Sequence, residues 1–346
     1  MPLTLPDLGW SAFFSGQCTE QGADATATPF RIAEVHRDRL TALSPGGEVS
    51  LTCGPTLTTG DIAVGDWVLA DDHGRVTRLL DRQTEIKRRA AGTGAQTQLI
   101  AANVDVLFLT TSCNADFNPA RLERYLALAR TAGAFPVVLL TKADQCVDPR
   151  SYAREVERLD PMLPAIALDA RDPAELANLA SWVRSGQTAA LLGSSGVGKS
   201  TLLNGLTGAA AATKGIREDD AKGRHTTTAR ALRRMTNGGW LIDTPGMRAL
   251  RLTGAEAGIE AVFADIEDLA QTCRFSDCKH EGEPGCAVQA AITAGRLDPD
   301  RLGRWRKLQR ENARNSETLA QARARDKDFG KMVRDVKSSM KTRKGY

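Results

Sequence analysis

The chain has 346 residues, of which 42% are apolar and 25% charged, and this ordinary globular composition leaves room for two or three domains. The longest apolar runs, such as residues 104–109, are too short to span a bilayer, and the N-terminus lacks the basic segment and apolar core of a secretory signal. These patterns argue against a membrane or secreted protein, and we expect a cytoplasmic one.

The net charge of +4 is unevenly distributed along the chain. Residues 301–346 contain 15 Lys and Arg against 5 Asp and Glu, a net charge of about +10, so the remainder carries about −6. A basic segment of this kind indicates an acidic partner, most simply nucleic acid. We expect the helices within 302–344 to bind RNA through contacts with its phosphates. A disordered solubilising tail, above all beyond residue 337, is the alternative.

The first 100 residues divide into two parts. Residues 1–29 are polar with few spaced apolar positions, and we expect a flexible arm with one short helix near residues 8–14. From residue 30 to 100, apolar and polar residues alternate with period two between turn signals such as 44–47, which predicts a small all-β barrel. The clearest strands are expected at 31–35, 39–43, 49–52 and 67–70.

Small barrels of this kind often bind nucleic acid through an exposed face of the sheet. Basic residues near the end of the barrel region favour RNA as the ligand, although a purely structural β module with a solvated charged face would look similar. These residues are Arg75, Arg78, Arg82, Lys87, Arg88 and Arg89.

From residue 101 the pattern changes to alternating strands and helices, which is typical of a parallel sheet with βαβ connections. Strands are expected at 104–111, 136–140, 165–168, 188–192, 229–235 and 240–242, and helices at 118–130, 149–159 and 173–183. In such a sheet ligands bind at the carboxyl ends of the strands, where Thr141 and Gly193 both fall.

A glycine loop after the strand at 188–192 meets the G-x-x-x-x-G-K-S spacing of a P-loop in full. Its residues are Gly193, Ser194, Ser195, Gly196, Val197, Gly198, Lys199, Ser200 and Thr201. The glycines let backbone N–H groups turn toward phosphates, and the helix that follows adds the positive end of its dipole. Lys199 would reach the β- and γ-phosphates, and the Ser200 hydroxyl would bind Mg²⁺. An ordinary glycine-rich turn is the alternative.

Asp243-Thr244-Pro245-Gly246 follows the strand at 240–242 and matches the D-x-x-G signature of GTPases. In that signature Asp243 would hold Mg²⁺ through water, and the Gly246 amide would donate to the γ-phosphate. A hydroxyl of Thr226 or Thr227, in the polar loop before the strands expected at 229–235 and 240–242, would complete the Mg²⁺ site. The motif is weak in isolation and strong when it follows a P-loop.

Thr141-Lys142-Ala143-Asp144 resembles the N/T-K-x-D guanine signature. The Asp144 carboxylate can accept hydrogen bonds from guanine N1–H and N2–H₂, whereas adenine offers no matching donors. The stem of Lys142 would pack along the purine face. A charged helix start is the alternative for the isolated motif, and Asp144 argues against an ATP-dependent enzyme.

The base-reading motif precedes the P-loop in this chain, whereas ordinary GTPases have it last. The sheet positions can be kept if the chain is circularly permuted, which would join the switch loop after Gly246 directly to the next domain. With these motifs, Ala102-Asn103-Val104-Asp105, the GRHTTT sequence at 223–228 and a C-terminal cysteine cluster, the chain from about residue 30 resembles the circularly permuted, small-ribosomal-subunit-dependent GTPase A family (RsgA/YjeQ-like).

The resemblance implies a domain order and a cellular role. The expected domains are an OB-fold over 30–100, a permuted GTPase domain over 101–255 and a zinc-binding domain with a basic helical tail over 256–346. The implied role is GTP hydrolysis stimulated by the 30S ribosomal subunit during its late maturation, with 16S rRNA as partner and GTP-dependent release. We expect a monomer that does not contact membranes.

Two positions depart from the family pattern. Thr141 stands where many members have Asn, which leaves open the contacts that this amide makes with the P-loop region. Residues 167–170, Ala-Leu-Asp-Ala, lack the usual Ser-Ala pair of the loop that backs the base, and the sequence assigns no contact there.

Met247 occupies the position after D-x-x-G, where Ras-like enzymes have a Gln that orients the attacking water. A Met side chain cannot orient water, so the free protein should hydrolyse GTP slowly and depend on a partner. His225 is the candidate substitute, because a neutral imidazole can position or deprotonate water, and Lys199 would act with it at the phosphates. Contact of His225 with RNA, phosphate or solvent alone is the alternative.

Cys273, Cys278, His280 and Cys286 supply three thiolates and one imidazole within fourteen residues. This is a closed tetrahedral set suited to structural Zn²⁺, with no open position for catalysis, and such a small domain is expected to fold only with metal. The other four cysteines are scattered, which argues against a disulfide framework. A chance cluster of buried cysteines is the alternative.

Two functions follow from these patterns. The first is an RNA-dependent GTPase that acts on the small ribosomal subunit. The second is a nucleotide-gated docking module in which hydrolysis matters little, and Met247 keeps this second reading open.

Overall fold

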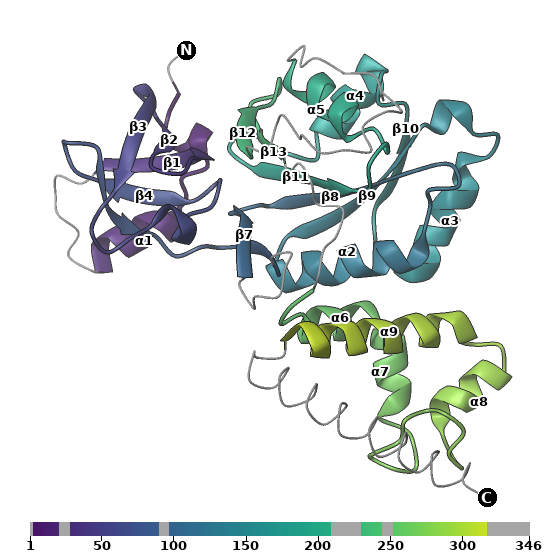
Figure 1. Cartoon of the computed structure of the whole chain (residues 1–346). Coiled ribbons are helices and arrows are strands. Elements are labelled where there is room, and N and C mark those ends of the chain that lie inside the picture. Colours follow the sequence, from purple (N-terminus) through teal and green to yellow (C-terminus); the bar gives the residue numbers. More distant parts are fainter. Residues whose placement is uncertain (1–2, 21–27, 90–96, 209–229, 244–251, 317–346) are drawn as a thin grey trace, which may run out of the picture.

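The structure is a computed structural model that describes residues 3–20, 28–89, 97–208, 230–243 and 252–316 (Figure 1). It has a β-barrel, an α/β domain beside it and a helical C-terminal domain packed against the α/β domain. This order of parts confirms the multidomain fold class predicted from the sequence. Among the residues that the structure describes, none of the helices combines the length and apolar character needed to cross a membrane.

The barrel is a closed sheet of five strands. They are β1 (Thr28–Val35), β2 (Leu40–Ser44), β3 (Gly47–Cys53), β4 (Trp67–Ala70) and β5 (Arg75–Leu79), with the short 3₁₀ turn η2 (Thr59–Asp61) before β4. The order is β1-β2-β3-β5-β4, and β4 pairs back onto β1 to close the barrel. Alternate residues point inward, and Ile32, Leu40, Leu51 and Val68 form a small core of their own.

Residues 3–20 are packed against the rest of the molecule, so the expectation of a flexible arm over 1–29 is wrong for this part. They form η1 (Pro6–Leu8) and α1 (Ala12–Glu20), and Leu8 and Phe14 are fully buried. The rings of Trp10 and Phe14 lie 4.8 and 5.8 Å from the ring of Trp67 in β4. Burial of these large aromatic side chains stabilises the segment.

The α/β domain contains a six-stranded sheet in the order β10-β9-β8-β11-β13-β12. The elements are β8 (Val106–Ser112), α2 (Pro119–Ala132), β9 (Phe135–Thr141), η3 (Ala143–Gln145), α3 (Pro149–Leu159), β10 (Ala165–Leu168), α4 (Pro173–Ala180), β11 (Thr188–Gly193), α5 (Lys199–Thr207), β12 (Ala231–Arg234) and β13 (Trp240–Asp243). The strands are parallel except β12, which forms an antiparallel hairpin with β13, so the sheet is mixed at this edge.

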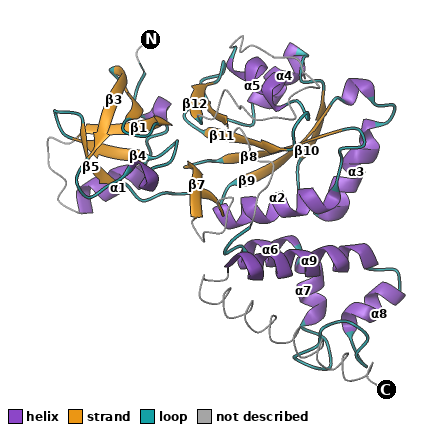
Figure 2. Ribbon diagram, in the orientation of Figure 1, coloured by secondary structure: helices purple, strands orange, loops and turns teal. Residues whose placement is uncertain are grey.

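Local sequence explains why the central elements form. All residues of β8 and β11 are buried, as expected for strands covered on both faces. Helix α2 begins after Asn118, whose side chain accepts a hydrogen bond from the Arg121 amide at 3.0 Å, and it ends at Gly133 with a left-handed φ of 75°. Helices α2 and α3 cover one face of the sheet, and α4 and α5 cover the other (Figure 2).

The barrel and the α/β domain are joined at several points. Strand β1 pairs with β12 at Glu34 and Ala231, so the two sheets are continuous. Between the barrel and β8, the chain forms a hairpin of β6 (Glu85–Arg89) and β7 (Thr97–Ala102) that the sequence did not predict. Arg82, just before this hairpin, donates to both oxygens of the fully buried Asp66 carboxylate at 2.7 Å.

Arg31 of β1 lies at the centre of this joint and is only 1% exposed. Its guanidinium donates to the carbonyl of Leu8 and to the hydroxyl of Thr188, the first residue of β11. Burial lowers the pKa of Arg31 to about 10, so the side chain keeps its charge at neutral pH. The barrel is thus hydrogen-bonded to the start of the strand that leads into the glycine loop.

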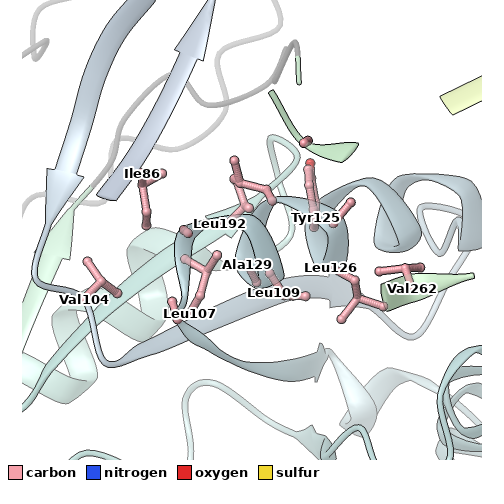
Figure 3. Packing of buried hydrophobic residues seen from close by; sticks show 14 of the residues in the cluster. Ile86, Val104, Leu107, Leu109, Tyr125, Leu126, Ala129, Leu192 and Val262 are labelled. Carbon is pink, nitrogen blue, oxygen red and sulfur yellow. The ribbon is translucent and has the colours of Figure 1, made fainter. Parts of the chain in front are cut away.

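The C-terminal domain consists of α6 (Glu256–Val262), α7 (Ala264–Ala270), α8 (Ala287–Thr293) and α9 (Pro299–Ser316). Helix α6 packs directly on α2. Figure 3 shows Leu107 and Leu109 of β8, Tyr125 and Leu126 of α2 and Val262 of α6 in one buried cluster. The α/β and C-terminal domains therefore share a hydrophobic core.

Candidate nucleotide site and metal centre

The glycine loop lies at the carboxyl end of β11, in the middle of the sheet. A Cβ on Gly193 would lie 2.2 Å from the carbonyl oxygen of Thr110 on β8, so only glycine fits there. Gly196 and Gly198 have φ angles of 80° and 93°, which favour glycine, and α5 begins at the next residue. The loop therefore has the strand, turn and helix context that a P-loop requires.

Two side chains of this loop, those of Lys199 and Ser194, donate hydrogen bonds. Lys199 Nζ donates to the carbonyls of Gly193, at 2.8 Å, and of Ser194. The Ser194 hydroxyl donates to Asp116 Oδ2 at 2.7 Å, and Asp116 also pairs with Arg121 at 2.7 Å. The sequence analysis missed Asp116; the only available signal was its position in the loop that follows the carboxyl end of β8.

Asp243 ends β13, the strand beside β11, and so lies at the same edge of the sheet. Burial raises the pKa of the Asp243 carboxyl, while the positive charges of Arg233 and Lys199 oppose this rise. The other predicted switch residues lie outside the described residues. They are His225, Thr226, Thr227, Gly246 and Met247.

Thr141 ends β9 and contacts the glycine loop directly. Its Oγ1 lies 2.7 Å from the carbonyl oxygen of Val197 and 3.0 Å from that of Thr111. The single hydroxyl hydrogen can be donated to only one of the two at a time, and the shorter distance favours Val197. The hydroxyl thus links the base-reading motif to the P-loop at the position where many family members have Asn.

We expect Thr141→Val to weaken guanine nucleotide binding about three- to tenfold, because it removes one buried hydrogen bond to the P-loop. Titration with a fluorescent GDP analogue measures the change. Thr111→Val is the matched control, since the Thr111 hydroxyl is equally buried on β8 and has no partner among the described residues. Equal losses in both variants would contradict the assignment.

The remaining residues of the base-reading motif form a tight turn. Lys142 has a left-handed φ of 59°, and Ala143 and Asp144 start the short 3₁₀ helix η3. Asp144 Oδ2 accepts a hydrogen bond from Arg171 Nη2 at 2.6 Å. Arg171 follows β10 and is also paired with Asp169, at 3.0 Å from Nε to Oδ1. The sequence analysis assigned no role to either residue.

The predicted metal ligands converge at one point of the C-terminal domain. The ligand atoms of Cys273, Cys278, His280 and Cys286 all lie within 4.8 Å of one another. The Sγ atoms of Cys273 and Cys286 are 3.9 Å apart, and His280 Nδ1 lies 3.6 and 3.5 Å from them. Tetrahedral Zn²⁺ with ordinary bond lengths requires separations of about 3.8 Å between sulfurs and about 3.6 Å between sulfur and nitrogen. All four donors therefore fit zinc in their chemistry, and Cys273, His280 and Cys286 also fit it in their spacing.

The comparisons with known proteins agree with this geometry. A family model described as RsgA GTPase matches residues 79–253. A Mesorhizobium japonicum protein named small ribosomal subunit biogenesis GTPase RsgA is 55% identical over 318 residues, which cover 90% of this chain and 91% of that protein. A Vibrio parahaemolyticus protein named small ribosomal subunit biogenesis GTPase RsgA 2 is 47% identical over 98% of this chain and 94% of its own length.

Two solved structures have the same fold. YjeQ from Thermotoga maritima matches with a TM-score of 0.57 over 82% of this chain and 97% of that one, and YloQ, a circularly permuted GTPase, with 0.58 over 85% and 98%. Both are 22% identical in sequence. The permuted order of motifs agrees with the second of these structures, and the chain belongs to the RsgA GTPase family.

Proposed function

We propose that this chain hydrolyses GTP and acts in the biogenesis of the small ribosomal subunit, as the names of its relatives state for those proteins. The observation that carries the proposal is the hydrogen bond between Thr141 and Val197, which holds a guanine-type carboxylate motif against a P-loop. We further propose that the protein acts late in 30S maturation, has 16S rRNA as a partner, and works as a monomer in the cytoplasm.

The proposed nucleotide site extends along one edge of the sheet. The P-loop amides would bind the phosphates, and Lys199 would leave its contacts with the loop carbonyls to reach the β- and γ-phosphates. Ser200 and Asp243, with Thr226 or Thr227, would hold the Mg²⁺ that neutralises the phosphate charge. Asp144 would accept the two guanine donors.

We propose that the Cys₃His cluster holds one structural Zn²⁺. All four positions are filled by protein atoms, so the ion would stabilise the small helical domain and leave no open site for chemistry. The barrel and the basic helices of the C-terminal domain are the proposed rRNA contacts, through Lys and Arg side chains on phosphates.

Hydrolysis would depend on a partner. Met247 offers no group that can orient water, and His225 is the proposed substitute. A partner that holds His225 beside the γ-phosphate would complete the site. The Met at position 247 also supports the second candidate function, a GTP-gated docking module with little hydrolysis of its own.

GTP turnover by the purified full-length protein tests the proposal, measured alone, with 30S subunits and with 50S subunits as the control. We expect slow turnover alone and strong stimulation by 30S only, which His225→Ala should abolish. Stimulation that survives in His225→Ala would remove the catalytic role of this residue. Absence of stimulation with intact GTP-dependent 30S binding would favour the docking module.

A further inference from the structure

The loop between β10 and α4 brings an arginine onto the base-reading carboxylate. Arg171 Nη2 lies 2.6 Å from Asp144 Oδ2 and 3.1 Å from Asp169 Oδ2, and its Nε lies 3.0 Å from Asp169 Oδ1. One guanidinium thus connects two carboxylates that come from neighbouring strands, β9 and β10.

Asp169 is itself fixed within the loop. Its Oδ1 accepts a hydrogen bond from the Arg171 amide at 2.9 Å, and its own amide donates to Glu175 of α4 at 2.5 Å. Asp169 therefore holds the Arg171 guanidinium in the loop before α4, and the Nη2 group also donates to Asp144. This planar, forked geometry is specific to arginine.

The contact leaves room for a base at Asp144. A carboxylate has about four lone-pair sites, and Arg171 uses one of those on Oδ2. Oδ1 and the second lone pair of Oδ2 stay available for guanine N1–H and N2–H₂. Arg171 also lines a hollow of about 520 Å³ together with Thr201, the residue that ends the P-loop sequence.

We propose that Arg171 is a positioning residue for guanine specificity, which holds the Asp144 carboxylate in the orientation that reads both guanine donors. The proposal rests on the proposed function, in which Asp144 reads guanine. Asp169 lies within residues 167–170, which lack the usual Ser-Ala pair, and Arg171 follows directly after them.

The test compares GDP with inosine diphosphate, which lacks the N2 amino group and so offers one donor fewer to Asp144. The ratio of their dissociation constants, measured by calorimetry on the full-length protein, reports how well the carboxylate reads the second donor. In Arg171→Met we expect GDP affinity to fall about fivefold, inosine diphosphate affinity to change little, and the ratio to fall accordingly. Arg171→Lys should restore only part of the ratio, because lysine lacks the fork.

Two further variants separate the possible failures. Arg154→Met is the matched control, since Arg154 on α3 is similarly exposed and pairs with Asp148, the N-cap residue of that helix, rather than with Asp144. Asp144→Asn should collapse the ratio whatever Arg171 does. Suppose that the ratio collapses in Asp144→Asn, but that Arg171→Met leaves the ratio unchanged, lowers both affinities equally or tightens GDP binding. Then the role of Arg171 is overturned, while the guanine-reading role of Asp144 stands. An unchanged ratio in Asp144→Asn overturns both the guanine-reading role of Asp144 and this inference.

Discussion

Replacing Cys286 with serine is expected to release the metal and unfold the C-terminal domain while the GTPase domain stays folded. Binding of structural zinc contributes roughly 10–16 kcal/mol of apparent free energy in small zinc domains, which is folding free energy when the ligands have no site in the unfolded chain. Cys286 is buried, and its Sγ also accepts the Gln289 amide at 3.4 Å as the N-cap of α8. The variant therefore loses a zinc ligand and weakens a helix start.

Three measurements check this expectation. Metal analysis should find about one zinc per chain in the wild type and far less in Cys286→Ser. Limited proteolysis should cut the region around residues 273–286 rapidly in the variant or after chelation, and guanine nucleotide binding should be retained. Cys146→Ser is the matched control, because Cys146 lies outside the cluster. A C-terminal region that stays equally resistant to protease after chelation would contradict the structural role of zinc.

The motifs were predictable because phosphate and zinc chemistry require particular residues at short, fixed spacing. The P-loop needs Gly193 for a close strand approach and Gly196 and Gly198 for left-handed turns, and the structure has both features. The four zinc ligands could be predicted because they all lie within fourteen consecutive residues. The barrel and the permuted sheet were predictable from period-two and strand–helix patterns, apart from the β6–β7 hairpin and the antiparallel β12.

Contacts between segments that lie far apart in sequence could not be predicted in this way. Residues 3–20 have no regular spacing of apolar residues that would predict their packing, and their burial depends on Trp67, which is distant in the chain. Arg171 reaches Asp144 only because β10 lies beside β9, and Asp116 reaches Ser194 only because β8 lies beside β11. No local pattern distinguishes these charged residues from solvated ones.

Glu123→Ala is expected to destabilise the packing of the C-terminal domain on the GTPase domain by about 3–5 kcal/mol, the typical cost of removing one partner of a buried ion pair. Glu123 of α2 is 1% exposed and accepts hydrogen bonds from Arg304 at 2.8 and 3.0 Å and from Arg301 at 3.1 Å, both on α9. Arg301 is itself buried, so the substitution removes a carboxylate partner from two cations, one of which is buried. Asp265 still pairs with Arg301, which keeps the loss at the lower end of this range.

Hydrogen exchange of α6 and α9, with thermal unfolding, measures the effect. Glu311→Ala is the matched control at the same interface, because the Arg124–Glu311 pair is about a quarter exposed and should contribute only about 0–1 kcal/mol. Zinc content separates this variant from Cys286→Ser: in Glu123→Ala the domain should keep its metal and its helices while losing protection along α2. Equal effects of the two glutamate substitutions would show that apolar contacts of α6, rather than the buried charges, hold the domains together. Because α6 follows the predicted switch sequence along the chain, we expect the strength of this packing to set how far a change at the nucleotide is transmitted to the C-terminal domain.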